Sequence, residues 1–556
     1  MNKTQPSPEK SATISRRLHL LLAVSLFLLA VFARVLPGPR TIDDSYITYR
    51  YARNILAGNG FVYNPDERVL GTTTPFYTIL LTALGFVSGG ANAPFPAIAM
   101  GVNAIADGLT CVLLYLIGKG LRTPIAGFGA GLAWAIAPYS VTFSIGGLET
   151  SLYVLLIVSV MYTYIIDQYI PAAFLSALAL LTRPDALLLI GPLVVDRVFQ
   201  YYALYSHRRR IDYPSGATSN ESTGKLVRGY TTEIIIFLLP LLLWVGFSAA
   251  YFQNPIPHSI AAKSVAYRLP SDAAFIRMIQ HYATPFMDDL TFGKLGIGIG
   301  LVLYPFLYAI GSLHSFSISR RTWPFLLFPW LYFLVYSIAN PLIFRWYLTP
   351  PLTALFLFIL IGADVTVQRL ARGISKKMFN NTDKQGSRMA VTMSIVFVVI
   401  TPTLLLLQGW TLHPEHGLSR PAPKMAWYEL ELLYKQAADY LSDDLTSRST
   451  PALLAAGDVG VLGYVTGTRI LDMVGLNSPQ SVKYYPADPS YYVINYAIPP
   501  DLIIDMQPDF IVILEVYGRA GLIKDVRFQK EYQLLDKIPT DIYGSDGMLI
   551  YERVSE

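Results

Sequence analysis

Cysteine is almost absent from this chain, and the single one, Cys111, lies inside an apolar run. One cysteine excludes an intramolecular disulfide and a thiolate metal site. Charged residues are also scarce, at 15% of the 556 residues, whereas soluble domains average about 25%. Hydrophobic residues make up 53% and the mean hydropathy is +0.42. This composition excludes an ordinary soluble protein and predicts an integral membrane protein.

Apolar segments long enough to cross a bilayer recur up to residue 408. The first, Leu18–Leu36, lacks a clear small-residue cleavage site, so we expect it to remain as a span rather than be cleaved as a signal. The others lie near residues 75–90, 98–119, 124–141, 150–167, 170–182, 186–203, 232–252, 295–312, 323–339, 346–366 and 389–408. The pattern predicts a polytopic α-helical membrane protein with about 11–13 hydrophobic spans.

Basic residues predict the orientation of this bundle. They gather in four polar segments, at residues 3–17, 207–228, 315–321 and 369–388. Because cytoplasmic loops carry an excess of Lys and Arg, we place these segments in the cytoplasm. The loops at residues 37–74 and 253–294, and everything after residue 409, are then extracytoplasmic. The net charge of +5 is spread over loops rather than gathered on one face, so we expect no nucleic-acid partner.

The number of apolar segments is inconsistent with this predicted orientation. Six apolar segments separate the outer loop 37–74 from the cytoplasmic segment 207–228, although an odd number is required. One segment therefore fails to span, and the short segments 75–90 and 170–182 are the candidates because about 20 residues are normally needed.

The sequence changes character after Trp410. Residues 425–441 alternate apolar and charged residues with helical period, and short β-prone runs follow at residues 452–456, 469–474, 510–514 and 548–552. We therefore predict two domains: a multi-span transmembrane domain over residues 1–408, and an extracytoplasmic soluble α/β domain over residues 409–556.

Two adjacent carboxylates, Asp43 and Asp44, follow the first span at the membrane–water boundary. After them Ile47, Tyr51 and Ile55 form one apolar stripe, which predicts a helix lying along the interface. The pair suits chemistry on a lipid-linked phosphate. It also suits capping, because acidic residues are favoured at N-caps and in the first turns of helices.

Further polar patches interrupt the apolar segments. Gly-Thr-Thr-Thr-Pro at residues 71–75 is either a polar segment of a site or a helix start with an early proline. Glu149 lies in a glycine-rich break between two spans, where it is either a second catalytic or acceptor-binding carboxylate or a cap. Arg183 and Asp185, in the motif Thr-Arg-Pro-Asp, lie at membrane depth, where charges are costly unless they are paired or functional.

Two patches carry cations on the predicted outer side. Asn-Pro-Ile-Pro-His-Ser-Ile-Ala-Ala-Lys, at residues 254–263, contains His258 and Lys263, which either hold a phosphate or are simply solvated. Phe-Arg-Trp-Tyr-Leu-Thr-Pro places Arg345 among aromatic residues that include Tyr347. Arg345 is either an interfacial anchor or a bidentate clamp on a phosphate or pyrophosphate leaving group.

The soluble domain contains two aspartates in glycine-rich surroundings. Asp458 lies in Gly-Asp-Val-Gly-Val-Leu-Gly-Tyr, and Asp472 lies in Leu-Asp-Met-Val-Gly-Leu-Asn. Both either bind sugar hydroxyls or form turns, for which Asp and Gly are favoured.

Together these motifs resemble one known family. Asp-Asp-Ser-Tyr-Ile-Thr-Tyr-Arg-Tyr-Ala-Arg-Asn after the first span resembles the first outer loop of membrane glycosyltransferases of the GT-C class. The patches at residues 146–150, 182–185, 254–259, 345–350 and 457–464 are similar to recurring motifs of the same class, in the same order. The subgroup most resembled contains the mycobacterial terminal arabinofuranosyltransferase, and the resemblance covers nearly the whole chain.

The resemblance implies an inverting enzyme that moves a sugar from a polyprenyl-phosphate donor to an extracytoplasmic glycan, lipid or protein acceptor, with the transmembrane domain catalytic. Asp44 or Asp43 would be the general base on the acceptor hydroxyl. The groups expected to hold the donor phosphate are Arg345, Lys263, Arg53 and His258. The residues expected to bind the acceptor or support the site are Glu149, Tyr347, Arg183, Asp185, Asp458 and Asp472.

Metal dependence stays open at this point. Some relatives use a divalent cation at the acidic pair and others do not. Oxygen ligands from Asp43, Asp44 and Glu149 would suit Mg²⁺ or Mn²⁺, but no histidine partner accompanies them.

The main alternative is a secondary transporter or a flippase of lipid-linked sugars. That class favours inverted repeats and charged or broken helices at the bilayer midplane. Here the ionisable residues lie at the ends of spans and the chain finishes in a soluble domain, which favours an enzyme. A non-catalytic polymer-binding or assembly protein is a third possibility, in which the acidic pair would be dispensable.

Overall fold

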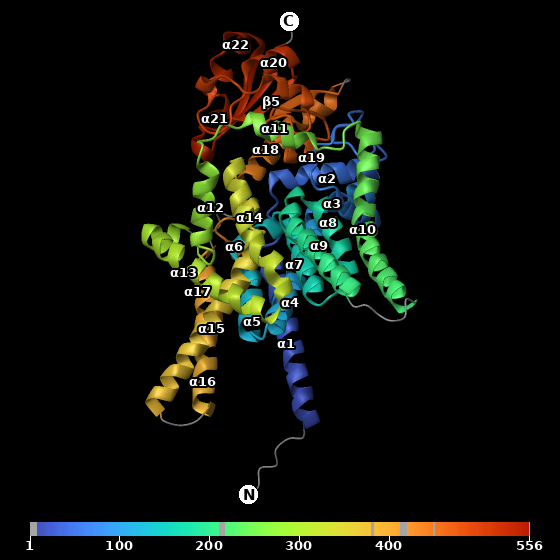
Figure 1. Ribbon diagram of the computed structural model, residues 1–556. Coiled ribbons are helices and arrows are strands. Elements are labelled where there is room, and N and C mark those ends of the chain that lie inside the picture. The colour runs from blue at the N-terminus through green and yellow to red at the C-terminus, as the bar shows by residue number, and fades with distance from the viewer. Residues whose placement is uncertain are drawn as a thin grey trace.

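The computed structural model describes residues 8–210, 217–287, 289–379, 383–411, 420–426, 428–448 and 451–554. Helices make up the chain as far as residue 407, and a mixed sheet with its own helices follows. The sheet region lies at one end of the molecule, and the first helix begins at the other (Figure 1). The predicted cytoplasmic segments 207–228 and 369–388 fall partly outside the described residues.

The helical part has the following elements. The first half contains α1 (Pro8–Val35), α2 (Asp43–Leu56), α3 (Pro75–Val87), α4 (Phe95–Gly120), α5 (Pro124–Ile136), α6 (Pro138–Ile145), α7 (Thr150–Ile165), α8 (Tyr169–Thr182) and α9 (Leu187–Arg210). The second half contains α10 (Ala217–Phe252), α11 (His258–Ala266), α12 (Ala273–Ala283), α13 (Asp289–Ile318), α14 (Trp323–Ala339), α15 (Leu352–Phe379), α16 (Asp383–Ser394) and α17 (Thr401–Leu407).

Eight helical segments within the described residues are long and apolar enough to cross a membrane. The pair α5 and α6, bent by 46°, makes a ninth if it is counted as one span, and α3, α7 and α8 are shorter apolar helices. The fold class predicted from the sequence, a polytopic helical membrane protein with a C-terminal α/β part, is therefore confirmed. The eight or nine candidate spans in the described residues are fewer than the 11–13 predicted, because three of the apolar segments form helices of only 13–16 residues. Prolines begin α3, α5 and α6, where the missing N–H would be unpaired in any case.

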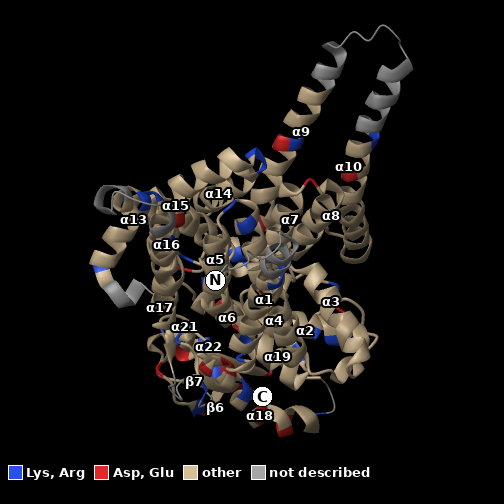
Figure 2. Cartoon of the chain, turned by 90° about the horizontal axis from the view of Figure 1, so that it is seen from below, with Lys and Arg blue, Asp and Glu red and all other residues tan. Residues whose placement is uncertain are grey.

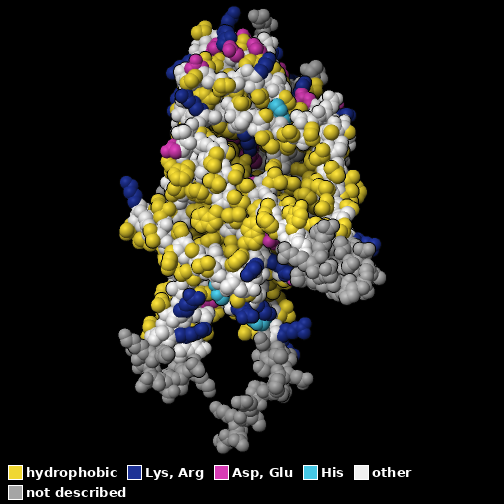
Figure 3. All heavy atoms as spheres, viewed as in Figure 1, with side chains coloured by type: hydrophobic (Ala, Val, Ile, Leu, Met, Phe, Trp, Pro, Cys, Tyr) yellow, Lys and Arg dark blue, Asp and Glu magenta, His cyan; other side chains and the backbone are white. Residues whose placement is uncertain are grey.

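The surface is divided as expected for a protein in a bilayer. A broad band of hydrophobic side chains surrounds the middle, while charged side chains gather on the C-terminal region and at the opposite end (Figure 3). Viewed from that end, α1, α4 and α5 lie near the centre of the bundle, and α9 and α10 project to one side (Figure 2). Lys and Arg gather at this end in the space-filling view (Figure 3), and its assignment to the cytoplasm remains a prediction.

The C-terminal region is built on a five-stranded sheet with the order β4-β3-β5-β7-β6. Its strands are β3 (Leu453–Ala456), β4 (Arg469–Asp472), β5 (Phe510–Leu514), β6 (Tyr532–Ile538) and β7 (Met548–Arg553). Strands β3, β4 and β5 are parallel, whereas β7 runs antiparallel to β5 and β6. Its helices are α18 (Glu429–Ser447), α19 (Gly460–Thr466), α20 (Pro500–Met506), α21 (Glu515–Gly518) and α22 (Val526–Glu531). A two-stranded sheet of β1 (Trp410–Thr411) and β2 (Ala422–Pro423) lies between the two regions in sequence.

Two short helices lie between the bundle and the C-terminal region. Helix α2 crosses the top of the bundle under α19, and α11 lies above α2, next to the C-terminal region (Figure 1). The predicted outer loops 37–74 and 253–294 are therefore largely helical, since the second contains α11, α12 and the start of α13. The division at residue 408/409 remains a prediction.

Candidate active site

A cavity of about 510 Å³ lies beneath the C-terminal region, where the surface is hollowed (Figure 3). It is bounded by α2, the start of α7, α11 and two 3₁₀ turns, Pro184–Ala186 and Arg345–Leu348. Half of the twelve residues predicted for the site line it: Asp44, Glu149, Arg183, Asp185, Lys263 and Tyr347. Residues far apart in sequence thus meet at one place.

The acidic pair lies in the first turn of α2, and neither side chain caps that helix. Ile42 takes the N-cap position without a side-chain hydrogen bond. Successive helix residues are rotated by about 100°, so the two carboxylates point in different directions. Both carboxylates still lie where acidic residues complement the dipole of α2, so this part of the capping alternative stands beside the catalytic one.

Asp43 points toward the C-terminal region. Its Oδ2 accepts a hydrogen bond from the Gly460 amide and its Oδ1 accepts one from the Val461 amide, each at 2.8 Å. The residue is buried, and this burial, with the nearby charge of Asp458, raises the pKa of the Asp43 carboxyl well above its usual range. Asp43 does not line the cavity.

Asp44 points into the cavity. It is half-buried and makes no hydrogen bond or ion pair with any residue that the structure describes. Its carboxylate is therefore available to accept a proton from a molecule in the cavity, which its neighbour Asp43 is not.

Three charged residues of the cavity wall form a compact group. Arg183 donates to Glu149 at 3.0 Å and makes a forked pair with Asp185, in which Nη2 lies 3.1 Å from Oδ2. Tyr332 and Tyr336 donate to the same Asp185 oxygen at 2.9 and 3.3 Å. Both negative charges are thus bonded to one buried guanidinium, as a buried charge requires. Glu149 pairs with Arg183 instead of capping α7.

The loop that carries Glu149 is held by its backbone. Asn103 donates from Nδ2 to the carbonyl oxygens of Ser144 and Leu148, at 3.1 and 2.8 Å. Tyr77 donates to the Gly147 carbonyl at 3.0 Å. Gly147 has a φ of +78°, and a Cβ there would lie 1.9 Å from the Tyr49 hydroxyl, so only glycine fits this turn. Asn103 and Tyr77 lie inside apolar segments and were not predicted as part of the site.

Helix α11 contributes a positively charged side chain, Lys263, to the cavity wall. Lys263 lines the cavity, its ammonium lies 5.1 Å from the centroid of the Phe344 ring, and it makes no ion pair with a described residue. Burial lowers the pKa of Lys263, but Tyr347, Asp44 and Glu149 outweigh burial, so the pKa is raised and the ammonium stays charged. Four residues earlier, the buried hydroxyl of Ser259 lines the same cavity without a hydrogen-bond partner in the described chain.

The remaining predicted cations lie elsewhere. Arg53 donates to the Tyr464 carbonyl at 2.6 Å and stacks on the ring of that residue at 4.6 Å. Arg345 is exposed and does not line the cavity, although its neighbours Phe344, Trp346 and Tyr347 do. His258 begins α11 outside the cavity wall, and burial lowers its pKa.

The two aspartates predicted in the C-terminal region are also absent from the cavity wall. Asp472 is fully buried and accepts hydrogen bonds from the Gly475 and Asn477 amides at 2.9 and 2.8 Å, which is the geometry of a turn. Asp458 is half-buried and accepts a hydrogen bond from Tyr434 at 2.8 Å. Burial raises the pKa of Asp458 to about 6 even though Tyr434 lowers it.

The carboxylates do not assemble into a metal site within the described residues. No group of three or more His, Cys, Asp or Glu side chains there is placed to hold a metal ion. Asp43 has both oxygens bonded to backbone amides, so it does not face Asp44 and Glu149 as a third ligand. We therefore derive no step that involves a metal.

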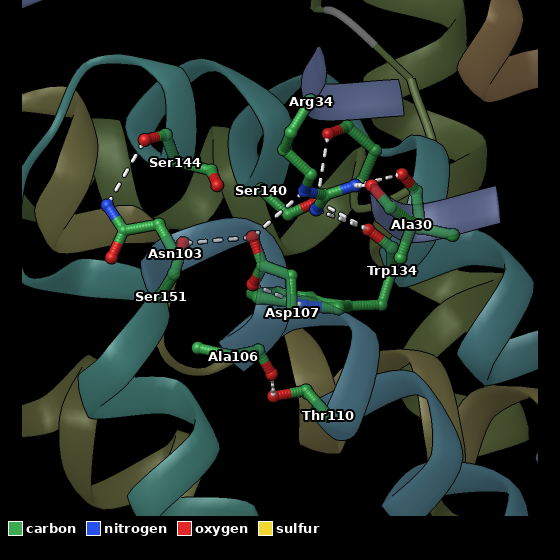
Figure 4. Close-up of polar contacts among 12 residues, drawn as sticks. Ala30, Arg34, Asn103, Ala106, Asp107, Thr110, Trp134, Ser140, Ser144 and Ser151 are labelled. Carbon is green, nitrogen blue, oxygen red and sulfur yellow. Dashed lines mark hydrogen bonds and ion pairs between the residues drawn. The ribbon is translucent and has the colours of Figure 1, made fainter. Parts of the chain in front are cut away.

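A second polar cluster, not predicted from the sequence, lies deep in the bundle (Figure 4). Arg34 and Asp107 form an ion pair at 3.0 Å with both side chains fully buried. Trp134 and Ser151 also donate to Asp107, each at 2.9 Å, and Arg34 donates to Ser140 at 2.8 Å. The signal was available, because Arg and Asp inside apolar segments are rare unless paired. The cluster joins α1, α4, α5, α6 and α7, and it lies outside the cavity wall.

The architecture just described, a helical membrane bundle with a cavity under an α/β region, is similar to that of solved membrane enzymes that transfer sugars. An oligosaccharyltransferase from Archaeoglobus fulgidus superposes with a TM-score of 0.54 at 14% identity, over 97% of this chain and 74% of that one. At this identity the likeness concerns the fold. ArnT from Cupriavidus metallidurans, bound to undecaprenyl phosphate, matches with a TM-score of 0.48 at 15% identity, over 98% and 99% of the two chains.

Sequence comparison agrees with the fold. The terminal β-(1→2)-arabinofuranosyltransferase of Mycobacterium tuberculosis is 30% identical over 191 residues, which cover 30% of this chain and 29% of that relative. Residues 425–551 match a family model described as "Domain of unknown function (DUF8728)". The resemblance to the mycobacterial arabinofuranosyltransferase that the motifs indicated is therefore confirmed over these 191 residues, and the likeness of fold to the oligosaccharyltransferase extends along nearly the whole chain.

Proposed function

We propose that this protein is an inverting glycosyltransferase that moves a sugar from a polyprenyl-phosphate donor to an extracytoplasmic acceptor in the cell envelope. One observation carries the proposal. A carboxylate without a hydrogen-bond partner, Asp44, and an ammonium without an ion-pair partner, Lys263, face the same cavity in the described chain. A general base and a stabiliser of a departing phosphate are the two groups that this reaction requires.

The proposed orientation places the cavity and the C-terminal region outside the cytoplasm. The basic segments and the lysine- and arginine-rich end of the bundle support it, because such residues mark the cytoplasmic side. The cavity lies at the other end, next to the apolar band, where a lipid-linked sugar and a water-soluble acceptor can meet.

In the proposed reaction the acceptor hydroxyl attacks C1 of the sugar from the side opposite the phosphate. The new C1–O bond forms as the bond between C1 and the phosphate oxygen breaks, and the configuration at C1 inverts. Asp44 takes the hydroxyl proton, while the bonding electrons leave with polyprenyl phosphate. Asp44 rather than Asp43 is proposed as the base, because both oxygens of Asp43 already accept backbone hydrogen bonds.

The departing phosphate is proposed to lie against α11, where Lys263 supplies a positive charge and the unpartnered Ser259 hydroxyl supplies a donor. Arg183 is less suited to this role because Glu149 and Asp185 already neutralise it. We propose instead that this group orients the acceptor or sugar through its carboxylate oxygens. Arg345, Arg53 and His258 do not line the cavity, so we do not propose them as ligands of the departing phosphate.

The alternative of a transporter or flippase makes a different prediction for the same cavity. A transporter would move the lipid-linked sugar without breaking the C1–O bond, and removal of a base would change little. The deciding experiment incubates the purified protein in proteoliposomes with a panel of radiolabelled polyprenyl-phosphate sugars and a membrane-derived acceptor extract. Release of polyprenyl phosphate and labelling of the acceptor are expected for one donor. Sugar movement across the membrane without transfer for every donor would contradict the proposal.

The role of Asp44 is tested in the same assay. Asp44→Asn keeps the size of the side chain and removes proton acceptance, so the rate is expected to fall by about 10²–10⁴-fold. Asp66→Asn, at an exposed position of the same outer segment, is the matched control and should leave the rate unchanged. A wild-type rate in Asp44→Asn would remove Asp44 from the mechanism and make Glu149 the next candidate.

A further inference from the structure

We propose that the C-terminal region is part of the catalytic machinery, because it holds Asp43 and thereby aims Asp44 into the cavity. This inference rests on the proposed function of Asp44. Asp43, Gly460 and Glu431 act in it as positioning residues and touch no substrate. The C-terminal region is then required for the chemical step itself, independently of any acceptor that it binds.

Three hydrogen bonds from two different helices converge on one residue. The Gly460 and Val461 amides of α19 donate to the two carboxylate oxygens of Asp43, each at 2.8 Å. The Asp43 amide in turn donates to Oε1 of Glu431 on α18, at 3.1 Å. All three residues, Asp43, Glu431 and Gly460, are buried. The first residue of α2 is thus bonded through both its side chain and its backbone.

The two helices also approach as closely as their atoms allow. A Cβ on Gly460 would lie 1.8 Å from the Asp43 carbonyl oxygen and 2.9 Å from its Oδ2. Real Cβ atoms do not make such contacts, so any side chain there would push the start of α2 away from α19. The glycine at position 460 therefore sets the distance between the C-terminal region and the acidic pair.

Contacts further along α2 prevent it from turning about its axis. Arg50 donates to the Thr468 carbonyl and Arg53 to the Tyr464 carbonyl, each at 2.6 Å. Tyr63, which follows α2, donates to the Val459 carbonyl at 2.6 Å. With the helix fixed at both ends, the rotation of about 100° between neighbouring residues turns Asp44 away from α19 and toward the cavity.

The chemical need for such fixing is strong. A base acts only within hydrogen-bond reach of the proton that it takes, and a misplacement of about 1 Å can reduce a rate by about 10²-fold. Asp44 itself has no hydrogen-bond partner among the described residues that would fix its position. Its direction is therefore set by its neighbour.

The test compares Asp43→Asn with wild type in the proteoliposome transfer assay, using the donor for which wild type is active. Asn has the size of Asp, but its Nδ2 faces an amide instead of accepting from it. We expect kcat to fall by about 10–100-fold with the donor KM unchanged, and the amides of residues 460 and 461 to exchange hydrogen faster. Val465→Ala, at an exposed position of α19, is the control and should change neither quantity.

A second variant tests whether the effect passes through the same contact. Gly460→Ala should lower kcat in the same way, and combining it with Asp43→Asn should cost no more than the worse single variant, because residues that act through one contact are not additive. If Gly460→Ala does not fold, the exchange and kinetic data for Asp43→Asn decide alone.

Three results would overturn the inference. The first is faster exchange at residues 460 and 461 in Asp43→Asn with kcat within twofold of wild type. The second is unchanged exchange with a loss of activity as deep as that of Asp44→Asn, which would make Asp43 the base. The third is full additivity of the two variants. Absence of transfer by wild type with every donor would instead refute the proposed function.

Discussion

Lys263 offers the most quantitative test of the cavity. Its ammonium lines the cavity, makes no ion pair with a described residue and lies over the Phe344 ring at 5.1 Å. Lys263→Met removes the charge and keeps an unbranched side chain of similar length. The apolar contact with Phe344 is then retained, so the change isolates the electrostatic contribution.

The expected magnitude follows from the charge of the phosphate. A sugar linked through a phosphodiester carries one negative charge, and the polyprenyl phosphate that leaves approaches two. Two unit charges about 4 Å apart interact by about 4 kcal/mol at an effective dielectric constant of about 20. If about half of the new charge has formed in the transition state, Lys263 stabilises it by about 2 kcal/mol, which is about 30-fold in kcat.

The charge already on the donor contributes to binding as well. Because Lys263 is only half-buried, solvent reduces this part, and we expect about a tenfold rise in KM. Together the two effects lower kcat/KM by about 10²–10³-fold. The assay is steady-state transfer with the identified donor, in proteoliposomes and at fixed ionic strength.

Two variants complete the experiment. Lys263→Arg keeps the charge and should retain kcat/KM within about threefold, whereas Lys435→Met, at an exposed position of α18, should have no effect. Because Tyr347, Asp44 and Glu149 raise the pKa of Lys263 against the effect of burial, the loss in Lys263→Met should be the same from pH 6 to pH 9. A kcat within threefold of wild type and an unchanged KM in Lys263→Met would refute the assignment of Lys263 to the phosphate.

Three other predictions follow from the contacts. Asp107→Ala leaves the Arg34 guanidinium buried without its counter-ion, which costs about 3–5 kcal/mol. The melting temperature in detergent should therefore fall, and an unchanged melting temperature would contradict the buried pair. Asn103→Leu removes two hydrogen bonds to the backbone beside Glu149, which costs about 1–3 kcal/mol for the unpaired carbonyls. Transfer should slow by about tenfold or more in protein that still folds. A wild-type rate would show that the loop keeps its shape without Asn103. Burial raises the pKa of Glu431 from 4.5 to about 8. Between these pH values the folded state binds more protons than the unfolded state, so the free energy of unfolding falls as pH rises. Glu431→Gln should flatten this fall in a pH series of melting curves, and an unaltered slope would contradict this role of Glu431.

Much of the fold was predictable because its signals are local. Long apolar runs set the spans, and four of the five strands of the C-terminal sheet lie where β-prone runs were predicted. Strand β6 was missed because its sequence, Tyr-Gln-Leu-Leu-Asp-Lys-Ile, mixes charged and apolar residues and its burial is partial. It is the edge strand beside β7, and edge strands need no continuous apolar face.

The site was predictable only in part. Motifs identified which residues carry charge near the outer ends of spans, and six of the twelve line one cavity. Sequence cannot give the direction in which a side chain leaves its helix when the partner is more than a hundred residues away. Asp43 and Asp44 were therefore equivalent in the sequence, and only the contact with α19, more than four hundred positions along the chain, separates them.

The same limit applies to the cations. Arg53 and Lys263 were both predicted to bind the donor phosphate. Arg53 donates to the Tyr464 carbonyl, whereas Lys263 has no ion-pair partner in the described chain. Ser259 lies in the motif at residues 254–259, but no role was predicted for it, because a serine in a helix is ordinary until its hydroxyl is found buried and unpartnered beside a cavity.

The charges of the cavity explain why base and cation belong in one enclosed site. Three carboxyl groups, from Asp44, Glu149 and Asp185, and two cationic side chains, Arg183 and Lys263, line the cavity. Under the proposed mechanism the donor adds one negative charge on binding. During transfer the proton moves to Asp44, which loses its charge, while the phosphate gains one, so the total charge of the cavity is unchanged across the step. Charge is displaced from Asp44 toward the phosphate rather than created, which is why a low-dielectric cavity need not oppose the reaction. The position of Lys263 relative to Asp44 then decides the direction of that displacement, because a cation near the phosphate stabilises the negative charge that develops on the phosphate.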